Sequence, residues 1–426
     1  MKQLGIIADD LTGALDVAGV FATVGMKTFT LVSNTGVPPG DYDVLSLNTQ
    51  TRNVSAREIS EPVRKATHSL QRLGYQRLYK KIDSTMRGHV GLELSMILEE
   101  SMAPYGFVIP AFPASGRVQL EGILYVRGIP LKSASEGIDD SGPTLSSHVC
   151  DILRTGVQEK IGLVPLSSTK AGPLEIKKTI DKLVDGTCKI LALDAKTPLH
   201  LAIIDSVIST HYPEGLVAGS AGIATAMARR IGSKMHPTRM PTRDADQILV
   251  ISGSINPVSY TQIRLLNSRL DSRLITMNIA AVLGSSAEVA QELDRVLSEI
   301  KAALFPVGLV TVAWGDQSST LSIIKDQQQN AAAHRIMHFI KHIGQGIGEY
   351  LGNAGLVVIG GDTAYSFLQG ISASGIAVEG EVQAGMPAGV ISGGSAEGIP
   401  IVTKAGGFGS EKALVDAIDH LRKNTA

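Results

Sequence analysis

Short apolar runs of strand length alternate along this chain with longer segments in which apolar residues recur every three or four positions. The first runs cover residues 4–8, 28–32 and 44–47, and a helical pattern through Val17, Phe21 and Val24 separates the first two. Parallel strands need crossover connections, which are usually helices. The pattern therefore predicts an α/β fold with a largely parallel sheet flanked by helices.

The same alternation continues to the C-terminal part of the chain. Further strands are predicted at residues 77–82, 107–110, 162–166, 189–194, 248–251, 274–278, 309–313 and 356–359. Helices are predicted at about 55–73 and after Gly88, and residues 215–228 have the pattern of a strand, a glycine turn and a helix. Residues 122–130 resemble a hairpin with Gly128 near its turn, and residues 133–147 a long surface loop.

The length of 426 residues exceeds what one hydrophobic core usually serves, which favours two domains. The clearest boundary lies at residues 232–246, a segment with two prolines, several basic residues and little apolar content. We therefore predict an N-terminal domain over 1–235, a linker over 236–246 with a hinge near Pro237 and Pro241, and a C-terminal domain over 247–426. Both domains are expected to be α/β, with the active site in the cleft between them.

Charge and cysteine content narrow the classes of function. The chain has 39 Lys and Arg against 40 Asp and Glu, so we expect neither nucleic acid nor a membrane surface as a partner. Two cysteines cannot form a disulfide framework, and the N-terminal apolar run is too short for a signal peptide. With no other apolar run of membrane-spanning length, the chain is expected to be cytoplasmic.

Two loops of the N-terminal half carry candidate chemistry. Asp9 and Asp10 follow the first predicted strand, at the edge where open α/β sheets bind ligands, although one of them or Thr12 could simply cap the next helix. The segment KKIDSTMRG at 80–88 also lies between a strand and a helix, and its Arg87 could bind a small carboxylate. A capped helix with solvated charges is the alternative. The two loops are expected to leave neighbouring strands.

The C-terminal half repeats one design, in which an apolar strand leads through small residues into a helix. SGSIN at 252–256 and GGDT at 360–363 follow this pattern, and ISGG at 391–394 and TKAGGFGS at 403–410 add flexible backbone. Helix N-termini and successive glycine N–H groups favour anions. The chain lacks the Walker A motif, a dinucleotide-binding GxGxxG after a strand and the protein-kinase signatures.

Seven segments in order, IADDLTGALD, KKIDSTMRG, PAFPASGR, GSAG, SGS, GGDTA and TKAGGFG, resemble the four-carbon acid sugar kinase family over nearly the whole chain. The resemblance implies ATP-dependent phosphorylation of the terminal hydroxyl of a four-carbon acid such as D-threonate, D-erythronate or 3-oxo-tetronate. It also implies that the N-terminal domain binds the acid and the C-terminal domain binds ATP. Leu15 and the pair Ile255-Asn256 depart from the family's pattern, and Leu15 leaves the identity of the acid open.

The resemblance assigns residues to each site. For the acid it implies Asp9, Asp10, Lys81, Asp83, Ser84 and Arg87, to which Arg117 is added from its loop context. For ATP it implies Ser252, Ser254, Gly360, Gly361, Asp362, Thr363, Gly406 and Gly407, and Lys404 is added as a cation beside these glycines.

Phosphoryl transfer requires positioning, charge neutralisation and an orienting group for the attacking hydroxyl. Our hypothesis is that Arg87 and Lys81 hold the substrate carboxylate and Asp10 orients or deprotonates the hydroxyl, with Asp362 as the alternative base. The glycine loops, Lys404 and Mg2+ would hold the triphosphate, with no metal ligands assigned. A non-catalytic sensor of acid and nucleotide, and a lyase or aldolase with Lys81 as the Schiff-base residue, are the alternatives. A homodimer is compatible with the sequence.

Overall fold

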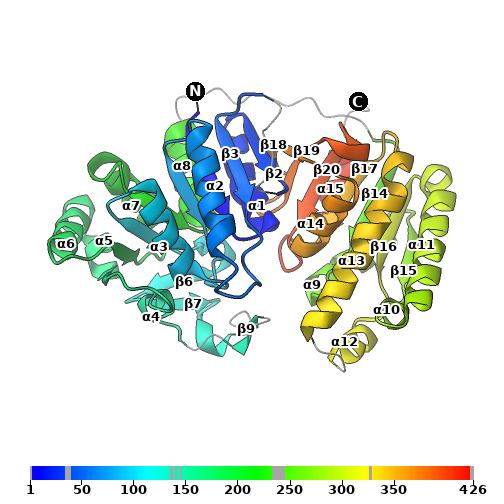
Figure 1. The fold of residues 1–426 in the computed structure, drawn as a ribbon, viewed down its shortest axis with the longest axis horizontal. Helices are drawn as coiled ribbons and strands as arrows, with labels where there is room; N and C mark the ends of the chain where they lie inside the picture. Colours follow the sequence, from blue (N-terminus) through cyan, green and yellow to red (C-terminus); the bar gives the residue numbers. More distant parts are fainter. Residues whose placement is uncertain are drawn as a thin grey trace. The chain divides into compact units, whose positions relative to one another are not determined.

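The computed structural model describes residues 2–33, 40–134, 138–139, 142–143, 146–232, 245–325 and 329–422. These residues form two compact units, one drawn from residues 1–237 and the other from residues 238–426 together with Phe29–Val32. Each unit has a mainly parallel sheet with helices packed on it (Figure 1). The predicted α/β class with two domains is confirmed.

The sheet of the first unit contains parallel strands in the order β11-β12-β5-β13-β4-β1-β3. Their bounds are β1 Leu4–Ala8, β3 Val44–Asn48, β4 Leu78–Lys81, β5 Gly106–Ile109, β11 Ile161–Val164, β12 Ile190–Leu193 and β13 Leu216–Gly219. All of them lie within or next to the apolar runs that predict them, because strands buried on both faces are apolar throughout.

Helices cover both faces of this sheet. They are α1 Leu11–Thr23, α2 Ser60–Arg72, α3 Val90–Ser101, α4 Val149–Leu153, α5 Leu166–Ala171, α6 Pro173–Asp185, α7 Pro198–His211 and α8 Ala221–Gly232. Consecutive side chains of a strand point to opposite faces. Lys80 of β4 contacts α3 through Glu93, whereas Lys81 contacts α1 at Gly13, so α3 and α1 lie on opposite faces.

Helix α2 begins at Ser60 and not near residue 55 as predicted. Residues 55–58 instead form a turn in which the Glu58 carboxylate accepts from the Ser55 N–H at 3.0 Å and from its hydroxyl at 2.6 Å. Pro62 lies in the first turn of α2, where the absence of an N–H costs nothing, and a helix extending further upstream would bury proline in its interior.

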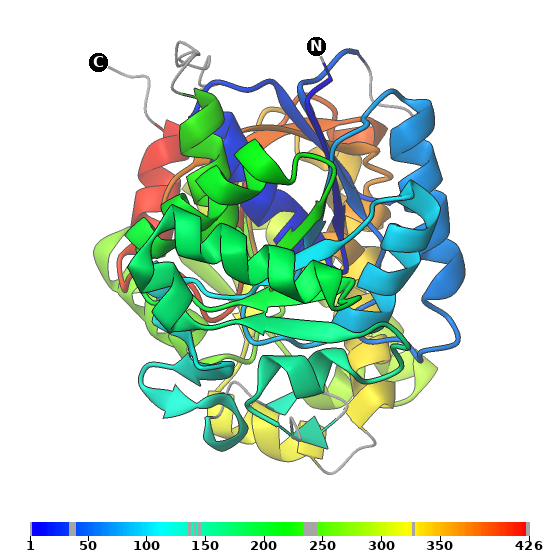
Figure 2. The ribbon, with the colours of Figure 1, turned by 90° about the vertical axis from the view of Figure 1, so that its left-hand side faces the viewer.

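A small antiparallel sheet follows β5, formed by β6 Arg117–Leu120, β7 Ile123–Val126 and β8 Ile129–Pro130. Figure 2 shows these strands in cyan. The predicted hairpin with Gly128 at its turn is confirmed as β7–β8, with Gly128 at φ +83°. Within the predicted loop at 133–147, β9 Ile138–Asp139 pairs with β10 Gly142–Pro143, and residues 135–137, 140–141 and 144–145 lie outside the described residues.

The sheet of the second unit has the order β18-β19-β20-β17-β14-β16-β15. The bounds are β14 Ile248–Ser252, β15 Arg273–Met277, β16 Leu309–Trp314, β17 Gly355–Ile359, β18 Gly375–Glu381, β19 Pro387–Ser392 and β20 Pro400–Lys404. The strands from β20 to β15 are parallel, whereas β18 and β19 are antiparallel. None of β18, β19 and β20 was predicted. Four residues expected as flexible backbone are instead paired in strands, Ile391 and Ser392 in β19 and Thr403 and Lys404 in β20.

One strand from the N-terminal part of the chain belongs to the second unit. Most of β2 Thr28–Leu31 falls within the segment Phe29–Val32 that groups with this unit, and the Val32 N–H donates to the Ser374 carbonyl at 3.1 Å. The pattern of residues 28–32 predicts a strand correctly but does not indicate which sheet it joins.

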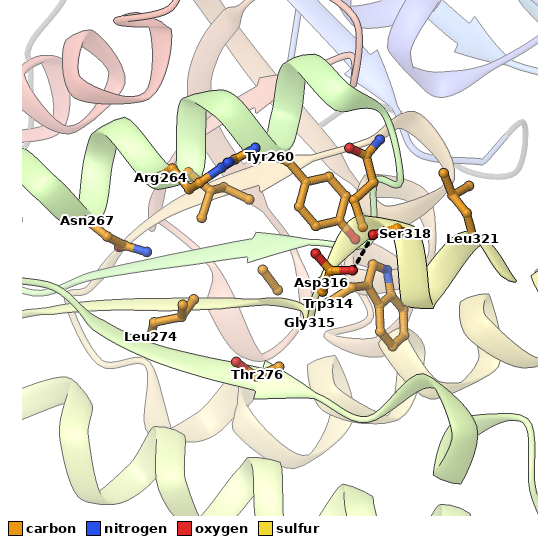
Figure 3. Close-up of a pocket in the computed structure, with 13 residues that line it drawn as sticks. Tyr260, Arg264, Asn267, Leu274, Thr276, Trp314, Gly315, Asp316, Ser318 and Leu321 are labelled. Atoms are coloured by element: carbon orange, nitrogen blue, oxygen red, sulfur yellow. Dashed lines mark hydrogen bonds between the residues drawn. The ribbon is translucent and has the colours of Figure 1, made fainter. Parts of the chain in front are cut away.

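The helices of the second unit are α9 Pro257–Arg269, α10 Ile279–Val282, α11 Ser286–Val307, α12 Gln317–Lys325, α13 Gln329–Ile347, α14 Gly361–Gly370 and α15 Ala413–Arg422. Helices α9 and α15 cover a core that includes Ile248, Leu266, Val357 and Leu421. Beside α9, at the carboxyl end of β16, lies a pocket of about 800 Å³ (Figure 3). None of the helices in the described residues is long and apolar enough to cross a membrane.

The linker predicted at 236–246, with its hinge at Pro237 and Pro241, lies outside the described residues except for its last two positions. Ala245 is 2 % exposed, packs in the core of the second unit and donates its N–H to the Leu421 carbonyl at 3.2 Å. The predicted domain boundaries at 235 and 247 stay predictions.

Candidate functional site

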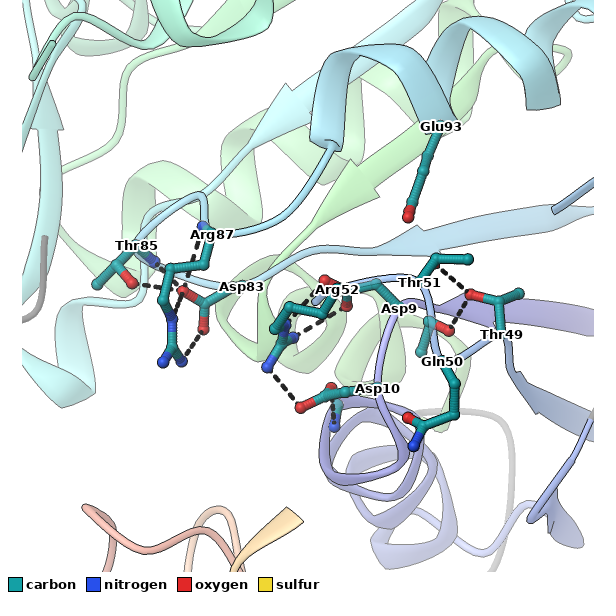
Figure 4. Close-up of polar contacts among 12 residues, drawn as sticks. Asp9, Asp10, Thr49, Gln50, Thr51, Arg52, Asp83, Thr85, Arg87 and Glu93 are labelled. Atoms are coloured by element: carbon teal, nitrogen blue, oxygen red, sulfur yellow. Dashed lines mark hydrogen bonds and ion pairs between the residues drawn. The ribbon is translucent and has the colours of Figure 1, made fainter. Parts of the chain in front are cut away.

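The first candidate site lies where β1, β3 and β4 end at the same edge of their sheet. Ala8, the last residue of β1, is in register with Asn48 of β3 and with Lys81 of β4. The loops that follow these strands therefore start side by side, as predicted for the loops after β1 and β4 (Figure 4). The loop after β3 adds a third group of side chains.

Arg52, in the loop after β3, joins both aspartates that follow β1. Its Nε and Nη2 donate to the two carboxylate oxygens of Asp9, each at 2.9 Å, and its Nη1 donates to Asp10 Oδ2. The backbone supports this pairing, since the Thr51 N–H donates to the Asp9 carbonyl at 2.9 Å. A bidentate arginine–carboxylate pair is one of the stronger and more directional polar contacts in proteins.

Adjacent carboxylates are tolerated here because cations surround them. Burial acts to raise the pKa of Asp9, but the charges of Arg52, Lys80 and Lys81 outweigh it, so that the pKa lies below its usual value. Asp10 is also the N-cap of α1, with its Oδ1 accepting from the Gly13 N–H at 2.8 Å. The capping interpretation of this pair of aspartates is therefore correct for Asp10, and Arg52 occupies its other oxygen.

The side chain of Lys81 packs against the first turn of α1 at Gly13. A Cβ at Gly13 would lie 2.9 Å from Lys81 Nζ and 2.6 Å from Asp10 Oδ1, so only glycine allows this approach. Lys81 is 5 % exposed, and its Nζ makes no hydrogen bond or ion pair with any described residue. One turn further along α1, burial raises the pKa of Asp16 to about 6, and its Oδ1 has no hydrogen-bond partner in the described chain.

The loop after β4 is organised around Asp83. Arg87 donates to it from Nε at 2.9 Å and Nη2 at 3.0 Å, and the Thr85 N–H donates at 3.1 Å. Although burial opposes it, the charge of Arg87 and these hydrogen bonds hold the pKa of Asp83 well below its usual range. Arg87 remains 38 % exposed with Nη1 outside these contacts, while Ser84 is buried.

A buried ion pair lies next to Lys81 at the end of β4. Lys80, also at the end of β4, pairs with Glu93 of α3, and both side chains are 1 % exposed. Arg117 is buried on β6, where its Nη1 donates to the Ser115 carbonyl in the preceding turn.

The second candidate site lies in the second unit, where β14, β17 and β20 end side by side. The Gly360 N–H donates to the Lys404 carbonyl at 2.8 Å, and Ser259 Oγ bridges Ser254 Oγ at 3.0 Å and the Gly406 carbonyl at 2.9 Å. All nine residues predicted for the nucleotide lie on these three strand ends, the loops that follow them or the first turn of α14: Ser252, Ser254, Gly360, Gly361, Asp362, Thr363, Lys404, Gly406 and Gly407.

Two neighbouring helix N-termini differ in this cluster. Asn256 caps α9 by accepting from the Val258 N–H at 3.0 Å, whereas the N-cap of α14 is Gly360, which has no side chain to do so. Gly360 adopts φ +108°, and Thr363 Oγ1 fills the space where a Cβ would lie. The N–H groups of Gly361 and Thr363 at the start of α14 bond to nothing else that the structure describes and can take an anion. The nearby Ser252 Oγ, in a residue 1 % exposed, also has no partner in the described chain.

Lys404, the last residue of β20, binds the backbone of the loop that follows this strand. Its Nζ donates to the carbonyls of Ala405, Gly406 and Phe408 at 2.8, 3.1 and 3.1 Å, and burial lowers its pKa to about 7. With these carbonyls turned inward, the N–H groups of Gly406 and Gly407 bond to nothing else that the structure describes. Successive N–H groups of this kind form an anion-binding nest.

Sequence reasoning missed Arg52 and the pairing of Lys80 with Glu93. Arg52 follows a correctly predicted strand, at the same kind of strand end that drew attention to Asp9, so its position was a usable signal. Glu93 gave no such signal, because it lies within an ordinary helical pattern.

The side chains that commonly bind metals are those of His, Cys, Asp and Glu. Across the described ranges, no group of three or more His, Cys, Asp or Glu side chains is placed to hold a metal ion. Mg2+ in nucleotide enzymes is usually held by substrate phosphates with one or two carboxylates, so this finding is compatible with a metal that arrives with a nucleotide.

Comparison with known proteins matches both units. Residues 4–227 match the family model described as the sugar-binding N-terminal domain, and residues 249–414 match the nucleotide-binding C-terminal domain. The fold is similar to the crystal structure of a Salmonella typhimurium LT2 protein, with a TM-score of 0.83 and 22 % identity over 98 % of this chain and 99 % of that one.

The curated relatives align with almost the whole chain. A D-threonate kinase of Bordetella bronchiseptica is 29 % identical over 99 % of this chain and 98 % of its own length. A D-erythronate kinase of Heliobacterium modesticaldum is 28 % identical over 99 % and 97 %. Since the first family match alone covers more than half of the chain, this protein belongs to the four-carbon acid sugar kinase family.

Proposed function

We propose that this protein transfers the terminal phosphoryl group of ATP to the terminal hydroxyl of a four-carbon sugar acid, with D-threonate, D-erythronate and 3-oxo-tetronate as the candidates. Full-length similarity to kinases of such acids supports the reaction class. The observation that carries the proposal is Lys81, a nearly buried cation whose charge lowers the pKa of Asp9 and opposes the raised pKa of Asp16, but whose Nζ makes no hydrogen bond or ion pair among the described residues.

The acid would bind at the ends of β1, β3 and β4. Lys81 and the outer edge of Arg87, whose Nη1 lies outside its contacts with Asp83, are the cations for the substrate carboxylate. Arg52 donates to the two aspartates from all three of its nitrogens, so its role is to hold them. The same site lets Asp9, Ser84 and the remaining lone pairs of Asp10 accept from or orient the substrate hydroxyls.

The nucleotide phosphates would bind at the ends of β14, β17 and β20. The N–H groups of Gly361 and Thr363 at the start of α14, together with those of Gly406 and Gly407, are the donors for anionic oxygens. Lys404 shapes this loop from within, and this replaces our initial hypothesis that its ammonium binds the triphosphate directly. Mg2+, when bound with ATP, neutralises charge on the phosphates, and Asp362 in the first turn of α14 is the nearby carboxylate of this loop.

An ADP-release assay with ATP, Mg2+ and each of the three acids tests this function. We expect one acid to raise ADP release well above the acid-free rate. If none does, the kinase proposal is wrong and a sensor of the same ligands becomes the better interpretation. Trapping of an adduct on Lys81 by borohydride would instead support the lyase or aldolase alternative.

Asp10→Asn tests the role of the carboxylate without removing the cap of α1, because asparagine is as good an N-cap as aspartate. Turnover is expected to fall by about 10²- to 10⁴-fold, the usual range for a group that moves or orients a proton. Near-normal turnover of a folded variant would exclude Asp10 from this role. Lys81→Met should raise KM for the acid and leave KM for ATP unchanged.

A further inference from the structure

The pocket beside α9 lies outside the residues that sequence analysis assigned to the nucleotide. Its walls come from α9, from β15 and from the turn between β16 and α12 (Figure 3). Tyr260, Ile263, Arg264 and Asn267 are spaced as one face of α9, so this whole face of the helix is turned to the pocket. The volume of about 800 Å³ falls within the range of about 300–1,000 Å³ that is usual for small-molecule sites.

The opposite wall is apolar and uncovered. Leu274 and Thr276 lie on the same face of the edge strand β15, and Leu274 is 44 % exposed despite its large side chain. Ala313 of the neighbouring strand β16 extends this surface and is buried, as is Ile263 on the α9 side. A flat, apolar ligand group can be covered here on two sides, by α9 and by the sheet.

Two hydrogen bonds join the pocket to the loop after β14. Trp314 Nε1 donates to the Gly253 carbonyl at 2.9 Å, and Gln317 Nε2 donates to the Ile255 carbonyl at 3.2 Å. The pocket therefore begins next to SGSIN, the loop proposed to lie at the nucleotide phosphates. A nucleotide with its phosphates at that loop could extend its base and sugar into the pocket.

Polar groups stand at opposite ends of the pocket, as Figure 3 shows for Asn267 and Asp316. Asn267 Oδ1 is buried and accepts no hydrogen bond within the described ranges, which is costly unless a ligand supplies a donor. An asparagine amide matches adenine, accepting from N6 and donating to N7. Asp316 uses Oδ2 to accept from Ser318 Oγ at 2.6 Å and the Ser319 N–H at 3.0 Å, so its Oδ1 can accept from ribose hydroxyls.

We infer that this pocket binds the adenosine part of ATP, with the base between α9 and Leu274, the amide of Asn267 on the base and Asp316 on the ribose. The assignment rests on the proposed function, in which the neighbouring loops bind the phosphates. Asp316 lies at the end of the pocket next to the loop after β14, and the ribose it would bind is the part of adenosine attached to the phosphates.

Leu274→Trp tests the pocket by filling it from an edge position that is already half exposed. Leu199→Trp is the matched control, because it makes the same change at a 67 % exposed leucine of α7 in the other unit. Binding of ADP and of inorganic tripolyphosphate is measured by calorimetry for both variants. Leu274→Trp should weaken ADP at least tenfold and leave tripolyphosphate unchanged, and the retained tripolyphosphate binding shows that the variant is folded.

Asn267→Leu tests recognition of the base itself. Loss of a bidentate amide–adenine pair should weaken ATP by about 5- to 150-fold. It should also reduce the preference for ATP over inosine triphosphate, which lacks the N6 amino group. A variant that merely disturbed α9 would weaken both nucleotides equally.

The outcomes separate this inference from the proposed function. If the wild-type protein turns over an acid while Leu274→Trp binds ADP normally, the adenosine assignment is overturned and the kinase function stands. If Leu274→Trp weakens ADP selectively but no acid is phosphorylated, the pocket assignment stands and the kinase function fails. A wild-type protein that binds no ADP overturns both.

Discussion

Replacing Arg52 by methionine would leave two adjacent carboxylates without the cation that joins them. The side chains of Asp9 and Arg52 are 3 % and 14 % exposed, so water can screen little of the resulting charge. Removing one partner of such a buried pair typically costs about 3–5 kcal/mol, because the remaining charge stays buried. Met is chosen since it keeps most of the apolar stem of the side chain.

The loss should depend on pH in a defined direction. In the native protein the pKa of Asp9 is lowered, so this pair contributes stability that is present above the unfolded value of 3.8 and is lost as the pH falls through the lower, folded value. Without Arg52, burial would raise the pKa of Asp9 instead. The difference between wild type and Arg52→Met should therefore be larger at pH 7 than at pH 4, and it should shrink further as the pH falls toward the lowered pKa of Asp9 in the wild type.

The two units can be followed separately in urea. The chain has one tryptophan, Trp314 in β16 of the second unit, whereas Arg52 lies in the first. With an m value of about 2 kcal/mol/M, the midpoint recorded by circular dichroism for the first unit should fall by about 2 M, and the transition of Trp314 fluorescence should stay where it is. Arg154→Met is the control, because its ion pair with Asp151 is exposed and should contribute at most about 1 kcal/mol.

A shift for Arg52→Met no larger than that of Arg154→Met at pH 7 would refute this reasoning. The loop would then tolerate the two carboxylates without Arg52. A pH-independent loss would show that Arg52 stabilises by packing and not by charge.

Three further predictions concern buried ionisable groups. Asp16→Asn should raise the free energy of unfolding by up to about 3 kcal/mol above pH 6 and by little at pH 4. The reason is that the raised pKa of Asp16 makes the wild type lose stability as the pH rises from 3.8 to about 6, whereas asparagine does not ionise. Urea midpoints at pH 4 and 8 measure the difference. The lowered pKa of Lys404 predicts that the second unit gains stability between about pH 7 and 10.5, and Lys404→Met should abolish that rise in Trp314 unfolding curves. Glu93→Gln should lower the free energy of unfolding by about 3–5 kcal/mol, because Lys80 stays buried without its partner. The double variant Glu93→Leu with Lys80→Met should recover most of this loss, as measured by thermal unfolding. No recovery would exclude an unpaired Lys80 as the cause.

Most elements could be predicted from the sequence because their signals are local. The parallel strands are buried on both faces and appear as short apolar runs, and the helices between them show their own period. The positions of Asp10, Asp83 and the glycine turns followed from the same pattern, since each comes directly after such a run. The start of α2 was wrong because one turn at Ser55 competes locally with the helix.

The partners of these residues depended on contacts between distant parts of the chain. Arg52 reaches Asp9 across 43 residues only because β3 pairs with β1, and Lys80 meets Glu93 only because α3 crosses the face of β4. The same holds for residues 29–32, whose pattern defines a strand and leaves its sheet open.

By itself, therefore, the sequence determined the fold class, most strands and helices, and the loops that carry the charged and glycine residues, because hydrophobic period and turn chemistry act over a few neighbouring residues. Only the tertiary structure decided which cation neutralises which carboxylate, that α14 and not α9 has an uncapped N-terminus, and that a pocket lies beside α9. The physical reason is that strand order and helix packing bring together side chains whose separation along the chain carries no signal of their contact.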